Sequence, residues 1–276
     1  MKKQIVIALA LGLLGRAHAA NFAGAVVDYT PGAGVGSYNN SSAALGQPGG
    51  IVSPGSFSGV FSPFNPHFET TELTGIGFGG QLTLQLQNYV TVSSGAFEIG
   101  VWSNVGLVDA SYPSGTATNP TTTFSTPRSA VISVSADGTN WILFKGGAAI
   151  PLSLPGNFYT NAGPFDTSAP ASPAFADFGK PFTGTLSDFN GETYPQVLAT
   201  LNGSAGGTWL DLYSTGLSQV GYIRFNGVAS GEVQYINGVS INSTLTGVAV
   251  PEPATAGLLI CGAALLLGFK RRRLNF

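Results

Sequence analysis

The chain has 276 residues, enough to build a full hydrophobic core, and only 9% of them are charged. Residues 20–250 contain 12 acidic residues but only four basic ones, so their net charge is −8. Nucleic acids and anionic lipids are recognised by basic patches, and neither is expected as a partner of this region. With one histidine and no cysteine in the same region, thiolate–histidine zinc sites are excluded.

The N-terminus has the three parts of an export signal. Two lysines precede an apolar run over residues 5–14, which is too short to cross a bilayer. Ala17 and Ala19 then supply the small residues that a signal peptidase accepts. We therefore predict a signal peptide over 1–19, cleaved after Ala19, rather than a buried helix or an uncleaved anchor.

Short strands dominate the first half of the middle region. Residues 81–87 alternate polar and apolar side chains, which predicts a half-buried strand. Residues 96–102 are β-branched and aromatic, so we expect a neighbouring strand there. An Asp-Gly pair at 137–138 separates 130–135 from 141–144 and predicts a hairpin, with both turn residues at positive φ and Trp141 in the core.

The second half continues the same pattern. Residues 220–225 and 232–241 predict two more strands, and the Asn-Gly pairs at 226–227 and 237–238 mark turns or bulges. No window between residues 20 and 250 shows a helical period. Many short strands with frequent turn residues indicate an all-β fold, a single β-sandwich or jelly-roll domain over 20–247.

Two stretches are rich in Gly, Ser, Asn and Pro, residues 29–66 and 151–195. Long loops of this kind in a compact domain are often functional or disordered. Asp166, Asp177 and Asp188 lie at regular spacing in the second stretch, each beside a phenylalanine. They could converge on calcium, which wants six or more oxygens, but compact calcium loops place a ligand at every second residue. Ordinary turn-forming aspartates are the favoured interpretation.

Few residues in the middle region suggest catalysis. Glu69 and Glu72 could form an acid–base pair for glycoside hydrolysis, although this spacing in a strand or loop favours a solvated edge. A Ser-His-Asp triad would need His67, but no Gly-x-Ser-x-Gly elbow accompanies it, so a neutral surface histidine is predicted. No catalytic residue and no cofactor follow from the sequence, and calcium is the one ion that its carboxylates suggest.

Aromatic residues offer a different kind of site. They could form a platform on which sugar rings stack, or they could pack into the core of a sandwich, and the loop tyrosines are the better candidates for ligand contact. The residues concerned are Trp102, Trp141, Trp209, Tyr29, Tyr38, Tyr112, Tyr159 and Tyr194.

The C-terminal segment, 248–276, is the most distinctive part of the sequence. The prolines of Pro-Glu-Pro stop regular structure, because each lacks an N–H and fixes φ. The following apolar stretch, 254–269, would rise about 24 Å as a helix, a little less than the hydrocarbon core of roughly 30 Å. We predict a membrane helix with its basic end in the cytoplasm, rather than a buried terminal helix, and with Cys261 packed within it. The motif and the basic stop consist of Pro251, Glu252 and Pro253, and of Lys270, Arg271, Arg272 and Arg273.

This order of motif, apolar helix and basic end resembles the PEP-CTERM sorting signal of Gram-negative bacteria. The resemblance covers 250–273 only. It implies that Pro251, Glu252 and Pro253 are recognised by an exosortase, a membrane transpeptidase-like enzyme, and that the helix is a temporary anchor. It also implies export to the cell envelope, the outer surface or the medium, often in species that make extracellular polysaccharide.

The middle region is similar to a family of bacterial cell-surface proteins with a discoidin-like or galactose-binding-like β-sandwich. The similarity rests on Ala-Leu-Gly-Gln-Pro at 44–48, Gly-Phe-Gly-Gly-Gln-Leu-Thr-Leu at 77–84, and Val-Ser-Ala-Asp-Gly-Thr-Asn-Trp at 134–141. The family's Asp-Phe-x-Val-Phe-Glu-Asn segment is replaced at 96–104, and its closing Phe-Asp-Leu-Asp-Ala at 233–237. The acids of the first pattern are lost, so no ligand or calcium role is carried over to this chain.

Together these features predict a non-enzymatic surface protein that contacts extracellular polysaccharide or other envelope material. The surface between residues 20 and 250 is acidic but poor in charge, and its many hydroxyl and amide groups suit hydroxyl-rich partners. Two alternatives remain open at this point. One is a glycan-active hydrolase that uses carboxylates of 151–195, and the other is a structural coat protein that assembles with itself.

Overall fold

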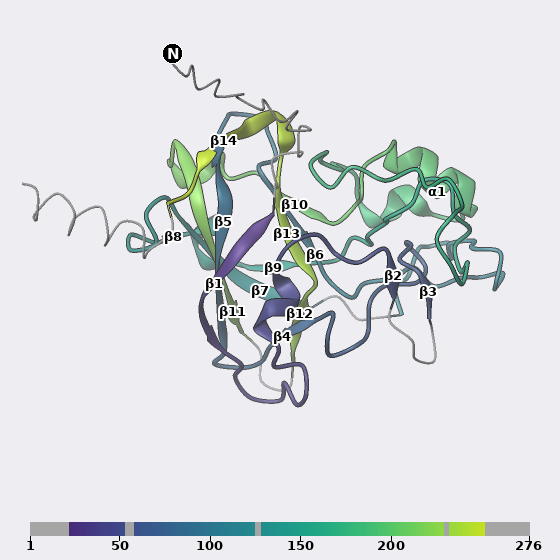
Figure 1. The fold of residues 1–276 in the computed structure, drawn as a ribbon, viewed down its shortest axis with the longest axis horizontal. Helices are drawn as coiled ribbons and strands as arrows, with labels where there is room; N and C mark the ends of the chain where they lie inside the picture. Colours follow the sequence, from purple (N-terminus) through teal and green to yellow (C-terminus); the bar gives the residue numbers. More distant parts are fainter. Residues whose placement is uncertain (1–21, 53–57, 125–127, 229–231, 252–276) are drawn as a thin grey trace, which may run out of the picture.

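The computed structural model describes residues 22–52, 58–124, 128–228 and 232–251. The regular structure in these residues is mainly β-sheet, with one α-helix, α1 (Tyr194–Leu201). The all-β prediction is therefore confirmed in its broad form, and Figure 1 shows the strands and the helix. No helix in this part of the chain is long and apolar enough to span a membrane.

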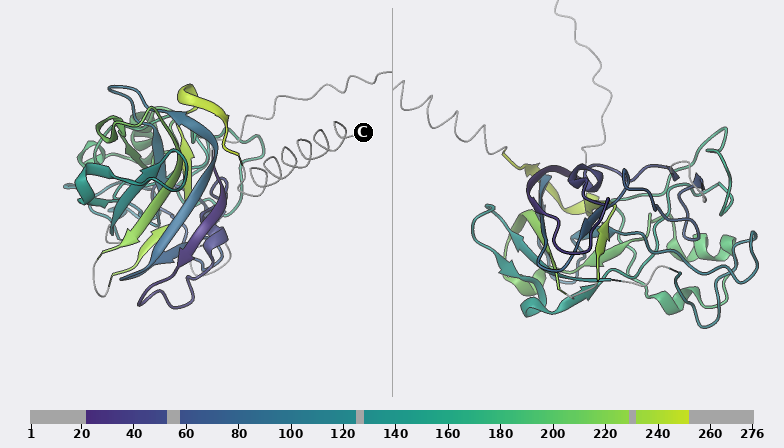
Figure 2. Two further views of the ribbon diagram at one scale, coloured as in Figure 1. Left: turned by 90° about the vertical axis from the view of Figure 1, so that its left-hand side faces the viewer. Right: turned by 90° about the horizontal axis from the view of Figure 1, so that it is seen from below.

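A seven-stranded antiparallel sheet, called the large sheet below, forms one side of the molecule. Its order is β1-β5-β11-β7-β8, with β14 also paired to β5 and β9 to β7, so strands far apart in sequence lie side by side. The left view of Figure 2 looks onto its outer face. The strands are β1 (Ala23–Thr30), β5 (Gln81–Thr91), β7 (Ser129–Ser135), β8 (Ile142–Leu143), β9 (Ala149–Pro151), β11 (Gln219–Gly227) and β14 (Thr246–Ala249).

A second, three-stranded sheet has the order β10-β6-β13 and is called the small sheet. The strands predicted at 81–87 and 96–102 both exist, but the prediction that they are neighbours is wrong, because one is in the large sheet and the other in the small sheet. Two antiparallel pairs, β2–β3 and β4–β12, lie beside the sheets. The bounds are β2 (Ile51–Val52), β3 (Gly59–Val60), β4 (Thr74–Ile76), β6 (Ile99–Trp102), β10 (Thr208–Leu210), β12 (Gln234–Ile236) and β13 (Gly238–Ile241).

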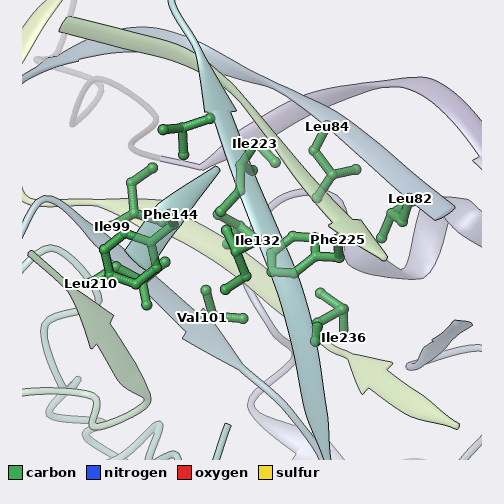
Figure 3. Close-up of a cluster of buried hydrophobic side chains, with 14 of the residues drawn as sticks. Leu82, Leu84, Ile99, Val101, Ile132, Phe144, Leu210, Ile223, Phe225 and Ile236 are labelled. Carbon is green, nitrogen blue, oxygen red and sulfur yellow. The ribbon is translucent and has the colours of Figure 1, made fainter. Parts of the chain in front are cut away.

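The main core fills the space between the two sheets. Alternate residues of β5, β7 and β11 point into it, and Figure 3 shows their side chains meeting those of β6 and β10. Burial of this much apolar surface is the dominant favourable term in folding, and the arrangement is sandwich-like. The core side chains labelled in the figure are Leu82, Leu84, Ile99, Val101, Ile132, Phe144, Leu210, Ile223, Phe225 and Ile236.

The small sheet is buried on its other face as well. Ile99 and Val101 of β6 point into the main core, whereas Trp102 belongs to a second apolar cluster. Apart from Trp102 and Trp209 of the small sheet, this cluster is formed by the loop lobe, which we define as the described parts of 47–67, 103–124 and 152–207, visible to the right in Figure 1. Its buried members are Val52, Phe61, Phe64, Trp102, Leu107, Ala117, Ala176, Phe178, Phe182, Phe189, Tyr194, Val197, Leu201, Ala205 and Trp209.

The helix α1 in this lobe corrects the prediction that the middle region has no helix. Its eight residues are too few to display a clear period, but its ends carry local signals. Thr193 and Gln196 form a capping box, and Pro195 lies in the first turn. Asn202 ends the helix in the left-handed region, at φ 50°.

The hairpin predicted at 137–138 is present but has a different turn. β7 and β8 pair with Ser133 opposite Leu143, and of the Asp-Gly pair only Gly138 has a positive φ. The Asp137 carboxylate accepts the N–H groups of Thr139 and Asn140, both at 2.8 Å, and so organises a longer loop. These bonds lower the pKa of Asp137, and the bond from Asn140 has the largest effect. Short 3-10 turns complete the fold at Ser41–Ala44, Phe144–Gly147, Leu186–Phe189, Tyr213–Thr215 and Ser243–Leu245.

The two Asn-Gly pairs differ in their roles. Asn226 and Gly227 are the last residues of β11 and are still paired with β7, so this pair is not itself a turn. Asn237 separates β12 from β13, and its side chain donates to the carbonyl of Glu72 at 2.7 Å. Here the expected interruption is confirmed, since the chain passes from the β4–β12 pair to the small sheet.

Candidate functional site

The predicted sorting motif begins where the described structure ends. Pro251 is described, whereas Glu252, Pro253, the apolar stretch 254–269 and the basic stop 270–273 lie outside the described residues. Ala17, Ala19 and the rest of the predicted signal peptide also lie outside them.

Pro251 is held on the outside of the large sheet. The Val250 N–H donates to the Gln87 carbonyl at 2.9 Å, continuing the pairing of β14 with β5. The Gln85 side-chain amide donates to the carbonyls of Val250 (3.4 Å) and Pro251 (3.0 Å). Gln85 is thereby buried, so β5 is covered on both faces instead of being half-buried as predicted. The first residue of the Pro-Glu-Pro motif is thus fixed against β5.

The three aspartates proposed for calcium each serve a local turn. Asp166 accepts the Gly163 N–H at 2.6 Å, and Asp177 accepts the Gly179 N–H at 2.7 Å. Asp188 caps a 3-10 turn by accepting the Thr185 N–H at 2.8 Å. The described residues contain no group of three or more His, Cys, Asp or Glu side chains that could hold a metal ion. The structure therefore does not bring the three carboxylates together.

His67 is buried, at 1% exposed, and the prediction of a surface histidine is wrong. Its Nε2 lies 3.0 Å from the Gly49 carbonyl, and its Nδ1 lies 3.0 Å from Oε2 of Glu72. The second contact is close but poorly directed, since Nδ1 has no partner of good hydrogen-bond geometry in the described part of the chain. Burial follows from the ring of Phe61, whose centroid is 4.6 Å from that of His67. Glu72 thus lies against His67, and its Oε2 also accepts the Glu69 N–H at 3.4 Å.

Glu72→Gln is expected to lower the free energy of unfolding by about 1–2 kcal/mol, because a weaker, neutral acceptor replaces the carboxylate that faces Nδ1 of the buried His67 and accepts the Glu69 N–H. Glu69→Gln is the matched control and should change it by less than about 0.5 kcal/mol, as substitutions at partly exposed positions usually do. Urea unfolding of the full-length protein measures both. Equal losses for the two variants would contradict this role for Glu72.

Glu98 is a buried carboxylate that sequence reasoning missed. It is 0% exposed, its Oε1 accepts the Ser93 N–H at 2.9 Å, and its Oε2 accepts the Leu212 N–H at 2.7 Å. Burial raises its pKa, although the two backbone bonds act in the opposite direction. Because the side chain is enclosed and fully used by backbone donors, it stabilises the fold and is not placed to meet a ligand.

The aromatic candidates separate into buried and accessible rings. Trp102, Trp209, Tyr159 and Tyr194 are buried, while Tyr29 and Tyr38 are half-buried. Tyr29 and Tyr38 each donate their hydroxyl to a backbone carbonyl. Tyr112 is 75% exposed, and of the predicted aromatic candidates it is the one whose ring is open to solvent.

Trp141 is half-buried on the outer face of the large sheet, so its predicted place in the core is wrong. The guanidinium carbon of Arg224 lies 3.8 Å from the Trp141 ring centroid, a cation–π contact. Nε of Arg224 donates to the Thr83 hydroxyl at 3.0 Å. Since a strand alternates its faces, Arg224 points outward between the core residues Ile223 and Phe225.

The loop that carries Tyr112 is fixed by Asp109, another residue without a signal in the sequence pattern. Oδ1 of Asp109 accepts the N–H groups of Ser111 and Thr116, both at 2.8 Å, and Oδ2 accepts that of Gly115 at 2.9 Å. We call residues 109–117 the Tyr112 loop. Three charge-assisted bonds to one carboxylate hold this loop in a single shape, and they make it the best-defined accessible site among the predicted candidates.

No protein-family model matches this chain, and no curated protein matches it at a significant level. The site must therefore be interpreted from its own geometry.

Proposed function

We propose that this chain is an exported, non-enzymatic protein sorted to the bacterial cell surface, where its β-domain contacts extracellular polysaccharide or other envelope material. The observation that carries the proposal is the position of Pro251. Pro251, the first residue of the motif, is exposed, and its carbonyl accepts a hydrogen bond from the Gln85 side chain at 3.0 Å on the outside of the large sheet. A processing enzyme that recognises Pro251, Glu252 and Pro253 would thus meet the first of these residues on the exposed outer face of the large sheet.

The same proposal includes the finer organisation of the chain. A signal peptide over 1–19 would direct export through the inner membrane, and a β-sandwich or jelly-roll domain over 20–247 would follow it. The segment 248–276 would hold the protein in the membrane until an exosortase-type enzyme acts on it. The face-to-face packing of the two sheets supports the sandwich, and it suits the resemblance to galactose-binding-like surface domains.

Two properties of the described surface support a carbohydrate partner. The domain has few charges and many hydroxyl and amide groups, which can exchange hydrogen bonds with a polyol. It also presents an exposed tyrosine on a rigid loop, and exposed aromatic rings on rigid elements are typical of binding surfaces.

The sorting proposal is tested in the native host with the full-length chain. Replacing residues 251–253 by three alanines is expected to leave the protein uncut in the membrane fraction, while the unmodified protein reaches the surface with a smaller mass. Surface labelling and mass spectrometry measure the two effects. Normal processing and surface display of the triple-alanine variant would refute sorting through this motif.

A further inference from the structure

The ring of Tyr112 is an exposed platform with a fixed neighbour. It is 75% exposed, and it meets Phe165 edge to face with 5.0 Å between the ring centroids. Phe165 is itself packed against the buried Phe64, at 6.4 Å between centroids. The exposed ring therefore rests on a chain of aromatic contacts that leads into the core of the loop lobe, and it does not swing freely.

The backbone that carries this ring is equally constrained. Besides the three bonds to Asp109, Thr116 pairs with Thr193 just before α1. Gly115 has φ +74°, and a Cβ at this position would lie 2.9 Å from Pro164 and 3.1 Å from Tyr194. Because the loop is already packed in one shape, a ligand that binds there loses little affinity to the conformational entropy of ordering it.

Polar groups lie beside the platform. Asp166 follows Phe165 directly and is exposed. Among the described residues, its carboxylate accepts one hydrogen bond, from the Gly163 N–H to Oδ2. Beneath them the Tyr194 side chain is buried, and its hydroxyl has no hydrogen-bond partner in the described part of the chain. Burial and, second, the Asp166 carboxylate raise the pKa of Tyr194, so this phenol stays protonated and remains a donor without an acceptor.

We propose that Tyr112, Phe165 and Asp166 form a binding site for a neutral saccharide unit of extracellular polysaccharide. This inference rests on the proposed function and gives it a location and a ligand class. The flat apolar face of a sugar ring stacks on the tyrosine, and its hydroxyl groups donate to the carboxylate, a charge-assisted bond. At the edge of the loop the Ser111 hydroxyl donates to that of Thr116 at 2.7 Å, and the remaining lone pairs of the two oxygens add acceptors.

The charges at this site select against acidic sugars. Asp109 is part of the Tyr112 loop, and Asp166 lies beside it. The negative charge of a uronate or sulfate group would be repelled by both carboxylates. A carboxylate that accepts hydrogen bonds from sugar hydroxyls needs no cation, so binding is independent of calcium.

The test uses full-length protein in mild detergent and two pools of the host's own exopolysaccharide, one neutral and one rich in uronic acid. Calorimetry is expected to show saturable binding of the neutral pool, unchanged by a chelator. Tyr112→Ala should weaken it by about tenfold or more, and Tyr112→Phe should bind nearly as the unmodified protein does. Asp166→Asn should weaken binding, because a neutral amide is a poorer acceptor.

Tyr213→Ala is the matched control, since Tyr213 is 58% exposed and lies away from the Tyr112 loop in the 3-10 turn Tyr213–Thr215. It should leave binding unchanged, and thermal unfolding should show that all variants are folded. If the unmodified protein binds the neutral pool and Tyr112→Ala binds equally well, or if only the acidic pool binds, the inference is wrong but a polysaccharide partner remains. If the folded protein binds neither pool, the polysaccharide contact in the proposed function fails as well.

Discussion

Trp102→Ala is expected to lower the free energy of unfolding by about 3–5 kcal/mol, the loss typical of a fully buried aromatic residue. Trp102 is 1% exposed and fills the contact between the small sheet and the loop lobe. Its ring lies 5.0 Å from that of Phe178 and 5.9 Å from that of Trp209, and its Nε1–H donates to the Ala205 carbonyl at 2.9 Å. The substitution therefore leaves a cavity and an unpaired carbonyl in the same place.

Trp141→Ala is the control for this prediction, because Trp141 is half-buried on the outer face of the large sheet. It removes the contact with Arg224, and its cost should be about 1 kcal/mol. Urea unfolding of the full-length proteins, followed by circular dichroism, measures both. Similar losses for the two tryptophans would show that the loop lobe does not depend on Trp102.

Glu98→Ala is the second substitution with a large expected effect, about 3–5 kcal/mol. It leaves the N–H groups of Ser93 and Leu212 buried without an acceptor, and each such group costs about 1–3 kcal/mol. Glu98→Gln keeps the size of the side chain but brings one amide donor against a backbone donor, so an intermediate loss is expected. A loss below about 0.5 kcal/mol for Glu98→Ala, the range of ordinary surface changes, would refute the bracing role.

The effect of Glu98 should also depend on pH. Its pKa in the folded protein is raised above the ordinary value of 4.5, chiefly by burial. The folded state therefore holds this proton more tightly than the unfolded chain does, and the associated stability is complete below pH 4.5. It is lost as the pH rises through the folded pKa. The difference in unfolding free energy between the unmodified protein and Glu98→Ala should accordingly shrink from pH 4 toward neutral pH, which unfolding curves at several pH values would show.

The sequence predicts individual strands well but not their partners. The alternation over 81–87 and the apolar runs over 130–135 and 220–225 correspond to β5, β7 and β11. Each of these patterns is local, because a strand that faces a core shows it in its own residues. Which strands pair depends on packing between distant segments, so 96–102 forms part of another sheet instead of lying next to β5.

The folded structure of the loop lobe was not predicted, for a related reason. Its glycines and prolines suggest an open loop, and its helix α1 is only eight residues long. The available signal was the repeated phenylalanine, which recurs through 158–189 and supplies much of the second apolar cluster. A buried cluster of this kind also explains why His67 is enclosed although its neighbours in sequence suggest a surface position.

The proposed binding site was predictable only in part. Tyr112 could be named from the sequence as a loop tyrosine, but none of the five tyrosine candidates stood out from the others. What distinguishes it is the carboxylate of Asp109, which gathers three backbone N–H groups. A single aspartate among turn residues carries no pattern that would reveal this role.

The attachment of the last described residues to β5 has a mechanical consequence. Val250 is bonded to Gln87, and Gln85 holds the carbonyls of Val250 and Pro251. A pull on the chain beyond Pro251 therefore acts first on these bonds and on β14, and it reaches β1 and β11 only through β5. The Gln85 side chain thus adds two hydrogen bonds to the β14–β5 pairing that such a pull would have to break.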